Sequence, residues 1–219
     1  SRLVDELRTL SLVSGALVMR GQAVSEGGSP YQLWHLVLRW IALLMDLSAK
    51  DRDMLRLLIP QLDETPPVAS MEPNKVQGRL LELLREMFTG QERPIVILLE
   101  DLHWAGMESL SLLAQFNAVV ADLPLLLVAS YRDDERPDLP EQLPDIPVLK
   151  LNRLDSDDIA KLSQAMLGDV GAQPQVVDLL QRETEGNVFF LIEVVRALAD
   201  EAGDLNQIGK MTLPQHVFA

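Results

Sequence analysis

Cysteine is absent from the 219-residue chain, so neither disulfide bonds nor thiolate metal sites can form within it. The absence also gives mild support for a reducing compartment. Basic residues are few, with 19 Lys and Arg against 33 Asp and Glu, a net charge of −14 and no run of cations. Because nucleic acids and anionic membranes are held by clustered cations, we expect neither as a direct partner of this chain.

Long apolar runs are lacking as well. The most apolar long stretch, residues 33–47, contains His35, Arg39 and Asp46 and is too short and too polar to cross a bilayer. The first residues show no charged segment followed by an apolar one, as a secretory leader would. We therefore predict a cytoplasmic protein. A hydrophobic content of 47% suits one large domain, or one domain with a small lid.

The most informative segment is an aliphatic run that ends on two acids. Residues 95–99 read Ile-Val-Ile-Leu-Leu and are followed by Glu100 and Asp101. Branched apolar residues without polar alternation are typical of a parallel strand that is buried on both faces. Glu100 and Asp101 would then lie at the strand's carboxyl end, where open α/β sheets bind ligands. Two acids there can hold a hydrated Mg²⁺ and orient a water molecule toward a phosphate, as Walker B acids do.

Strand-like and helix-like segments alternate on either side of this run. Short apolar runs predict further strands at 16–19, 125–129 and 148–151, and helical spacing predicts helices at 3–10, 31–62, 80–87 and 108–121. Repeated strand–helix–strand units favour an α/β fold, with a parallel sheet and helices on both faces. From Asp155 onward the pattern is purely helical. We predict two domains, an α/β core at 1–153 and a small all-α subdomain at 154–219.

Three segments in this order resemble the ATPase module of STAND proteins, which are multidomain signal-transduction ATPases in a branch of the P-loop NTPases related to AAA+ ATPases. The segments are Leu99–Ala105, Ser130–Glu135 and Thr184–Glu193. The ordered set is more specific than any one of them, and the likeness covers nearly the whole chain. It implies a P-loop NTPase-like core with a helical lid, ATP or ADP as ligand, and Mg²⁺.

The resemblance also implies roles for individual residues. Glu100 matches the acid on the Mg²⁺ side, and Asp101 matches the acid that positions or activates the attacking water. Arg132 matches the sensor-1 position that reports on the γ-phosphate, where a guanidinium can form a planar, permanently charged fork. Gly186 and Asn187 match the lid motif that closes on the nucleotide. His103 and Trp104 match the family too, but the sequence gives neither a catalytic role.

The chain departs from the family at its start, because it contains no glycine-rich loop ending in Gly-Lys-Ser or Gly-Lys-Thr. It begins Ser1-Arg2-Leu3-Val4, which resembles the residues that follow the lysine in this family. We therefore expect Ser1 to be a Mg²⁺-binding hydroxyl, and the glycines and lysine to lie upstream in a longer protein. Residues 211–215 resemble the approach to a winged-helix domain, so we expect a winged-helix or helical-repeat sensor downstream.

Two further departures concern single positions. Gly106 stands where relatives commonly carry an acid, and Val188 replaces a proline that contacts the nucleotide in relatives. Weaker adenine-side affinity or weaker ADP retention would follow from the second departure. The acids that match hydrolytic residues are unchanged.

Each residue singled out here also has a plainer interpretation. Glu100 and Asp101 could form an ordinary strand-to-helix turn, and Arg132 could belong to a solvated charge cluster with the acids that follow it. Gly186 and Asn187 could form a helix C-cap or a loop turn, and Ser1 could be a frayed first residue. The three histidines, His35, His103 and His216, lack metal-ligand spacing. We assign no transition-metal site.

The sequence therefore predicts the nucleotide-binding, ATP-hydrolysing switch module of a larger signal-transduction protein, with little hydrolysis by this fragment itself. Its partners would be the nucleotide and other domains of the same polypeptide, with oligomers forming on activation. An alternative from another class is a degenerate, non-hydrolysing scaffold that retains the fold and binds a partner protein. A metallohydrolase built on Glu100, Asp101 and His103 is a weak third, since ligands crowded into four residues rarely converge on one ion.

Overall fold

The computed structural model describes residues 2–25, 28–59, 62 and 73–202, and the chain divides into two compact units, Ser1–Val148 and Leu149–Ala219. The sequence prediction placed this boundary between residues 153 and 154. Ser1 and residues 211–215 lie outside the described residues, so their predicted roles stay predictions.

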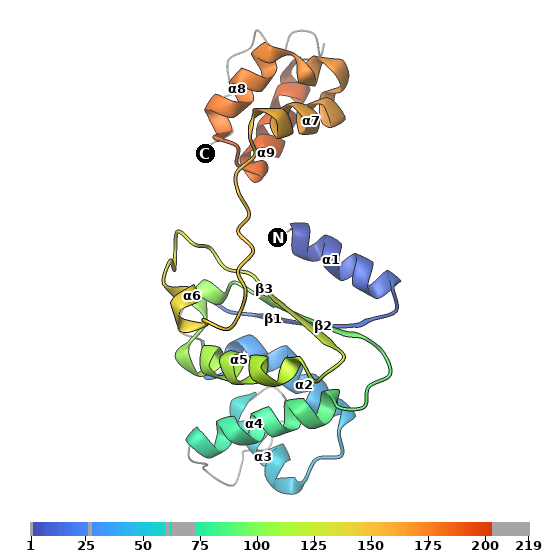
Figure 1. The fold of residues 1–219 in the computed structure, drawn as a ribbon, viewed down its shortest axis with the longest axis vertical. Helices are drawn as coiled ribbons and strands as arrows, with labels where there is room; N and C mark the ends of the chain where they lie inside the picture. Colours follow the sequence, from blue (N-terminus) through green and yellow to red (C-terminus); the bar gives the residue numbers. More distant parts are fainter. Residues whose placement is uncertain (1, 26–27, 60–61, 63–72, 203–219) are drawn as a thin grey trace. The chain divides into compact units, whose positions relative to one another are not determined.

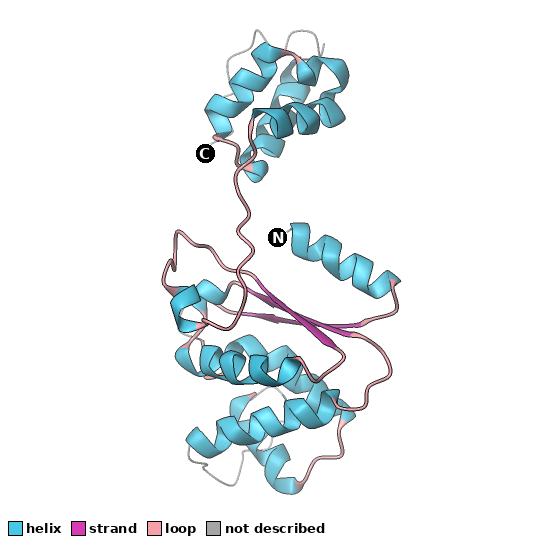
Figure 2. Cartoon of the chain, in the orientation of Figure 1, coloured by secondary structure: helices cyan, strands magenta, loops and turns pink. Residues whose placement is uncertain are grey.

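Among its described residues, the first unit contains a parallel sheet of three strands in the order β1-β2-β3 (Figure 2). The strands are β1 (Leu17–Gln22), β2 (Ile95–Glu100) and β3 (Leu125–Ala129). Gln22 pairs in register with Glu100, and Leu99 pairs with Ala129. All six residues of β2 are buried, as expected for a strand without polar alternation. The predicted α/β class with a parallel sheet is confirmed.

Helices cover both faces of this sheet, as predicted. In Figure 1, α1 lies on one face, α2 and α5 lie on the other, and α3 and α4 form a further layer beneath them. The helices of this unit are α1 (Arg2–Val13), η1 (Gln32–Trp34), α2 (His35–Leu44), α3 (Ala49–Leu58), α4 (Pro73–Phe88), η3 (Leu102–Trp104), α5 (Met107–Val120) and α6 (Leu139–Gln142).

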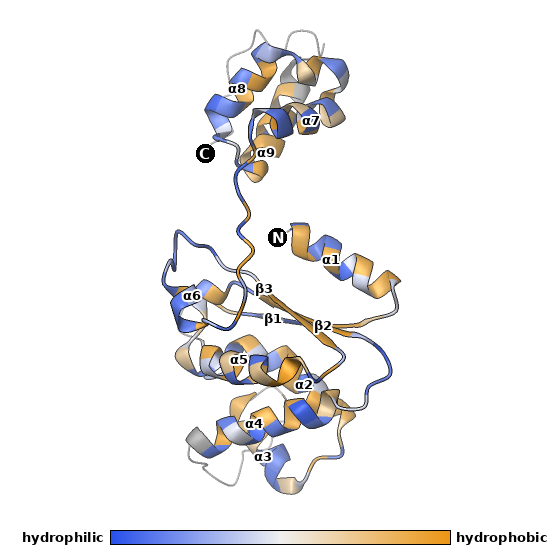
Figure 3. Ribbon diagram, viewed as in Figure 1, coloured by the Kyte–Doolittle hydropathy of each residue, from blue (hydrophilic) through white to orange (hydrophobic). Residues whose placement is uncertain are grey.

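The side chains on the two faces of β2 pack into two separate apolar clusters. Ile95, Ile97 and Leu99 join the main core, which also contains Trp34 and Phe116 with their rings edge to face at 5.8 Å. Residues 96 and 98 pack with α1 on the opposite face. Figure 3 shows the resulting apolar colour along β2 and β3. Because successive side chains of a strand point to opposite faces, one continuous apolar run fills both clusters.

Two predicted elements differ in the structure. The predicted strand at 148–151 does not form, and its apolar side chains are exposed, with Leu149 84% accessible. These residues pair with no strand among the described residues, so they lack the backbone hydrogen bonds that a strand needs. The predicted helical region at 31–62 is interrupted between α2 and α3. Met45 is extended there, and the Ser48 hydroxyl caps α3 by accepting the Asp51 N–H.

The second unit is a small helical bundle with its own core. It contains α7 (Ser156–Leu167), η4 (Gly168–Ala172), α8 (Pro174–Thr184) and α9 (Val188–Ala202). Ile159, Val176, Leu180, Leu191 and Leu198 are fully buried in it. The Asp155 carboxylate caps α7, and Pro174 begins α8, where its missing N–H costs no hydrogen bond. The predicted helical C-terminal part is confirmed.

In the part of the chain that the structure describes, every helix is too short or too polar to cross a bilayer.

Candidate functional site

The carboxyl ends of the three parallel strands lie along one edge of the sheet. Gln22 is the last residue of β1 and lies beside Glu100, the last residue of β2. On the other side of β2, the Ser130 N–H donates to the Leu99 carbonyl at 2.8 Å, one residue beyond the end of β3. The segments that carry the predicted site residues Glu100, Asp101 and Arg132 therefore leave the sheet at the same edge.

Glu100 is buried and is held by a cation from the neighbouring strand. Its side chain is 8% exposed, and its Oε1 accepts hydrogen bonds from Nε of Arg20, at 3.0 Å, and from Nη2 of the same guanidinium. The hydrogen bond to Glu100 raises the pKa of Arg20 above its ordinary value, so this guanidinium stays charged. A buried carboxylate needs such a partner, because charge taken out of water without compensation is costly.

Asp101 occupies a left-handed backbone conformation, with φ of 59° and ψ of 41°. Its Oδ2 accepts a hydrogen bond from Gln22 Nε2 at 2.8 Å. A non-glycine residue with positive φ is uncommon and is concentrated at sites where the surrounding structure fixes it. The turn separates the two acids, so that Glu100 is held by Arg20 and Asp101 is held by Gln22.

The backbone of Arg132 is hydrogen-bonded to His103 at this edge, while its guanidinium pairs with Glu135. Its N–H donates to His103 Nδ1 at 3.3 Å, two residues after Asp101. Its side chain is 62% exposed, and Nη1 donates to Glu135 at 2.7 Å. The plainer interpretation, a charge cluster with the following acids, therefore describes this contact of the side chain.

The lid residues Gly186 and Asn187 belong to the second unit and have local structural roles. Gly186 has a φ of 76°, and a Cβ there would lie 2.2 Å from the Leu154 carbonyl oxygen, so only glycine fits. The Asn187 side chain accepts the N–H of Phe189 at 3.0 Å, at the start of α9. The plainer interpretation as a turn accounts for both residues, and their predicted contact with nucleotide stays a prediction.

The acid pair has the chemistry that Mg²⁺ requires, although it does not form a complete protein cage. Within the described ranges, no group of three or more His, Cys, Asp or Glu residues is placed to hold a metal ion. Magnesium is usually bound through one or two carboxylates, with waters and phosphate oxygens completing its shell. Glu100 and Asp101, adjacent hard oxygen donors at the sheet edge, fit that mode of binding. Arg20 would have to yield part of its hold on Glu100.

Two small hollows lie on the first unit, and neither encloses the acid pair. The larger, about 200 Å³, is lined by residues that include Leu17 and Ile95, the first residues of β1 and β2, and so lies at the opposite end of the strands. The smaller, about 60 Å³, is lined by residues that include Ala23, Gln32 and Trp104. Ligand pockets for small molecules usually measure several hundred Å³. Neither hollow reaches that size.

Arg20 and Gln22 were not identified from the sequence. The predicted strand ended at Met19, whereas β1 continues to Gln22. Polar residues at alternate positions directly after an apolar run were the available signal, because they fall on one face of a strand near its carboxyl end. Their partners depend on the register between β1 and β2, which the sequence alone does not reveal.

Comparison with known families gives one result that bears on this edge. A family described as AAA ATPase domain matches residues 1–128, which is more than half of the chain. The chain belongs to this family of ATPase domains, and the match covers β1, β2 and the acid pair. Comparisons with curated proteins and with solved structures found no match.

Proposed function

We propose that this chain is a Mg²⁺-dependent nucleotide switch that binds and hydrolyses ATP, of the STAND type, within a signal-transduction protein. The observation that carries the proposal is the buried Glu100 followed by Asp101 at the carboxyl edge of a parallel sheet, in a chain of the AAA ATPase domain family. Phosphoryl transfer needs charge stabilisation and positioning more than covalent chemistry, and an acid pair at this edge can supply both.

The roles proposed for the two acids follow from how each side chain is held, and the other roles follow from the resemblance to STAND proteins. Glu100, fixed at the end of β2, would hold the metal ion, which when bound neutralises charge on the phosphates. Asp101 would orient a water molecule and accept its proton, and Gln22 fixes the side chain through its 2.8 Å hydrogen bond. Arg132 would place its guanidinium on the γ-phosphate oxygens. The nucleotide contact predicted for Gly186 and Asn187 belongs to the same proposal.

One alternative is favoured by a specific observation. Arg20 already neutralises Glu100, which is what a module that kept the fold without the metal would need. Such a module would be a non-hydrolysing scaffold that binds a partner protein. Titration of the natural full-length protein with labelled ATP and Mg²⁺ distinguishes the two functions. The switch predicts saturable, Mg²⁺-dependent binding, and a scaffold predicts none.

Several finer expectations belong to the same proposal. They are a cytoplasmic location, a winged-helix or helical-repeat sensor in the same polypeptide, control of transcription or another output, and assembly into oligomers on activation. Activated and resting full-length protein, compared by light scattering with and without ATP, would test the last of these.

A further inference from the structure

The segment after β2 is joined to the segment after β3 residue by residue. Each of the four residues 102–105 forms a hydrogen bond with a residue of 130–136, in the same order along both segments. The pairs are Leu102 N–H with Ser130 O at 2.9 Å, His103 Nδ1 with Arg132 N–H at 3.3 Å, Trp104 Nε1 with Glu135 Oε2 at 3.1 Å, and Ala105 O with Arg136 Nη1 at 2.9 Å. We call this set the strap. It links the turn at Asp101 to the position of Arg132.

His103 is the buried centre of the strap. Its side chain is 1% exposed, and its Nδ1 accepts the Arg132 N–H, so the neutral ring carries its proton on Nε2. Nε2 lies 3.5 Å from Glu135 Oε2, and no residue in the described part of the chain forms a hydrogen bond with it. A buried N–H without a hydrogen-bond partner is costly, so this N–H stabilises the Glu135 carboxylate in its position facing the ring.

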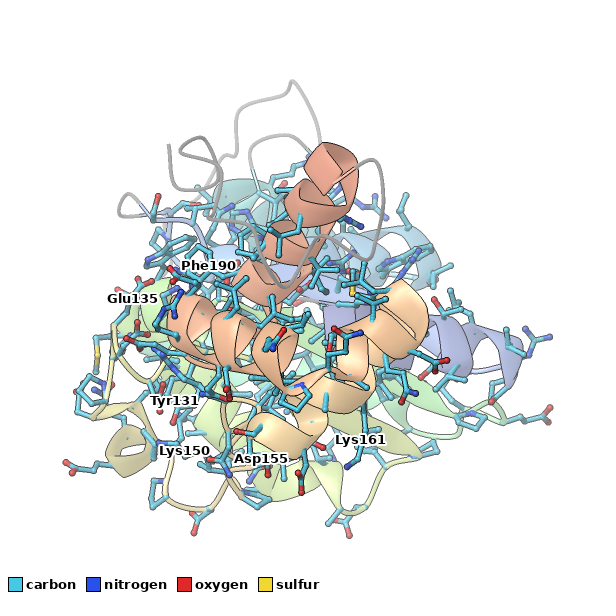
Figure 4. The ribbon with its side chains drawn as sticks, turned by 90° about the horizontal axis from the view of Figure 1, so that it is seen from above. Tyr131, Glu135, Lys150, Asp155, Lys161 and Phe190 are labelled. Carbon is cyan, nitrogen blue, oxygen red and sulfur yellow. The ribbon has the colours of Figure 1, made fainter. Side chains whose placement is uncertain are left out.

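Glu135 is the acceptor on which the side chains of the strap converge. Its Oε1 accepts from Arg132 Nη1 at 2.7 Å, and its Oε2 accepts from Trp104 and faces His103. Figure 4 labels Glu135 on this segment, together with Tyr131, which packs against the main core. The hydrogen bond from Trp104 does not involve the Arg132 guanidinium, so Glu135 would keep this donor if the guanidinium moved away.

We propose that Glu135 is a positioning residue that holds the Arg132 guanidinium in a resting place, and that the γ-phosphate of ATP competes with Glu135 for it. The inference rests on the proposed function, because it takes Arg132 as the phosphate-sensing residue. The exchange is feasible because Arg132 is 62% exposed, and exposed ion pairs are weak, whereas a polyphosphate offers several charged acceptors. ADP lacks the γ-phosphate and should leave the resting pair in place. The strap would thus make the site discriminate ATP from ADP.

The test compares ATP and ADP affinities of the natural full-length protein in the presence of Mg²⁺. Glu135→Gln keeps an oxygen for Trp104 but removes the charge that holds Arg132. We expect ATP to bind about two- to fivefold more tightly, which is what an exposed ion pair is worth, with ADP affinity unchanged. Asp134→Asn is the matched control, since it removes an equal charge from the exposed neighbouring residue. Its effect, if any, should be the same for both nucleotides.

A second variant shows whether the effect acts through Arg132. Glu135→Gln should change nothing in an Arg132→Ala background, because no guanidinium is left to release. Glu135→Asp, which keeps the charge but shortens the side chain, should fall between wild type and Glu135→Gln. Thermal unfolding confirms that each variant is folded. Equal tightening of ATP and ADP, no tightening, or an undiminished effect in the Arg132→Ala background would overturn the inference. A wild-type protein that bound neither nucleotide would contradict the proposed function itself.

Discussion

Arg20 stabilises the buried carboxylate of Glu100 in the first unit. The guanidinium is 41% exposed and the carboxylate is 8% exposed, so water screens one partner far better than the other. Removing the exposed partner takes a hydrogen-bonded cation away from the buried carboxylate, and this cost exceeds the worth of an ordinary surface ion pair. The Glu100 carboxylate that would bind the metal ion is therefore the same group that pairs with Arg20 and stabilises the fold.

Arg20→Met should lower the free energy of unfolding by about 1–3 kcal/mol, because Glu100 then lacks its hydrogen-bonded cation. Adding Glu100→Gln to this variant should recover part of the loss, since a neutral amide is less costly to bury than a carboxylate. Urea unfolding of the single and double variants measures the coupling. Strictly additive losses would show that the contact contributes nothing.

Among the helices and strands, close packing leaves no room for a side chain at Gly21 in β1. A Cβ at Gly21 would lie 2.0 Å from the Leu33 carbonyl oxygen and 2.9 Å from the Leu99 side chain. The η1 backbone therefore approaches β1 more closely than any side chain allows. Gly78, in α4, has nothing within 4 Å of its Cβ position, which makes it a matched control.

We expect Gly21→Ala to destabilise the protein by about 1–3 kcal/mol or more, since backbone atoms must shift. Gly78→Ala should instead stabilise it by about 0.5–1 kcal/mol, because alanine favours an open helical position. Thermal or urea unfolding of both variants checks the pair. Similar effects of the two substitutions would mean that η1 does not approach β1 as described.

An ion pair between α3 and α4 predicts how stability depends on pH. The Arg79 guanidinium donates to both carboxylate oxygens of Asp51, at 2.8 and 3.0 Å, and these bonds hold the pKa of Asp51 below its ordinary value of 3.8. A carboxylate with a lowered pKa stabilises the fold above its unfolded pKa, and this contribution is lost as pH falls through the folded pKa.

Asp51→Asn should therefore reduce stability at pH 7 by about 1–3 kcal/mol, and the difference from wild type should shrink below about pH 4. Asp53→Asn is the control, because Asp53 is 31% exposed and its ion pair among the described residues is with Arg56 in the same helix. Its effect should stay under about 1 kcal/mol. A constant difference across the acid range for Asp51→Asn would exclude the ion pair as its source.

The elements that the sequence predicted well are those whose signal is local. The apolar runs of β2 and β3 predicted both strands, and the helical pattern at 108–121 predicted α5 to within one residue at each end. The failures depend on distant partners. Residues 148–151 have the composition of a strand but pair with no strand in the described structure. Likewise, the partners of Glu100 and Asp101 follow from the register between β1 and β2, which no local pattern encodes. The pair between Arg132 and Glu135 is local, and the sequence offered it as the plainer interpretation.

At the scale of the whole molecule, the two units have separate apolar cores that share no residue. Leu112 is fully buried in the first unit, and Leu180 is fully buried in the second. Truncating either side chain to alanine should cost about 2–5 kcal/mol in its own unit. Stability should therefore be lost unit by unit rather than across the chain.

Hydrogen exchange measures this separation directly. Leu180→Ala should speed amide exchange in α8 and α9 and leave β2 as protected as in wild type, and Leu112→Ala should do the reverse. Loss of protection in both units from either substitution would show that they unfold as one cooperative body.

We propose that the acids at the end of β2 form a site for ATP and Mg²⁺ in which Asp101 activates water. Asp101→Asn in the natural full-length protein tests this role most directly, because asparagine keeps an oxygen for Gln22 but cannot accept a proton. We expect ATP hydrolysis to fall by about 10²–10⁴-fold while Mg²⁺-dependent ATP binding remains within a few-fold of wild type. Equal loss of binding and hydrolysis, or hydrolysis that continues unchanged, would contradict this role of Asp101.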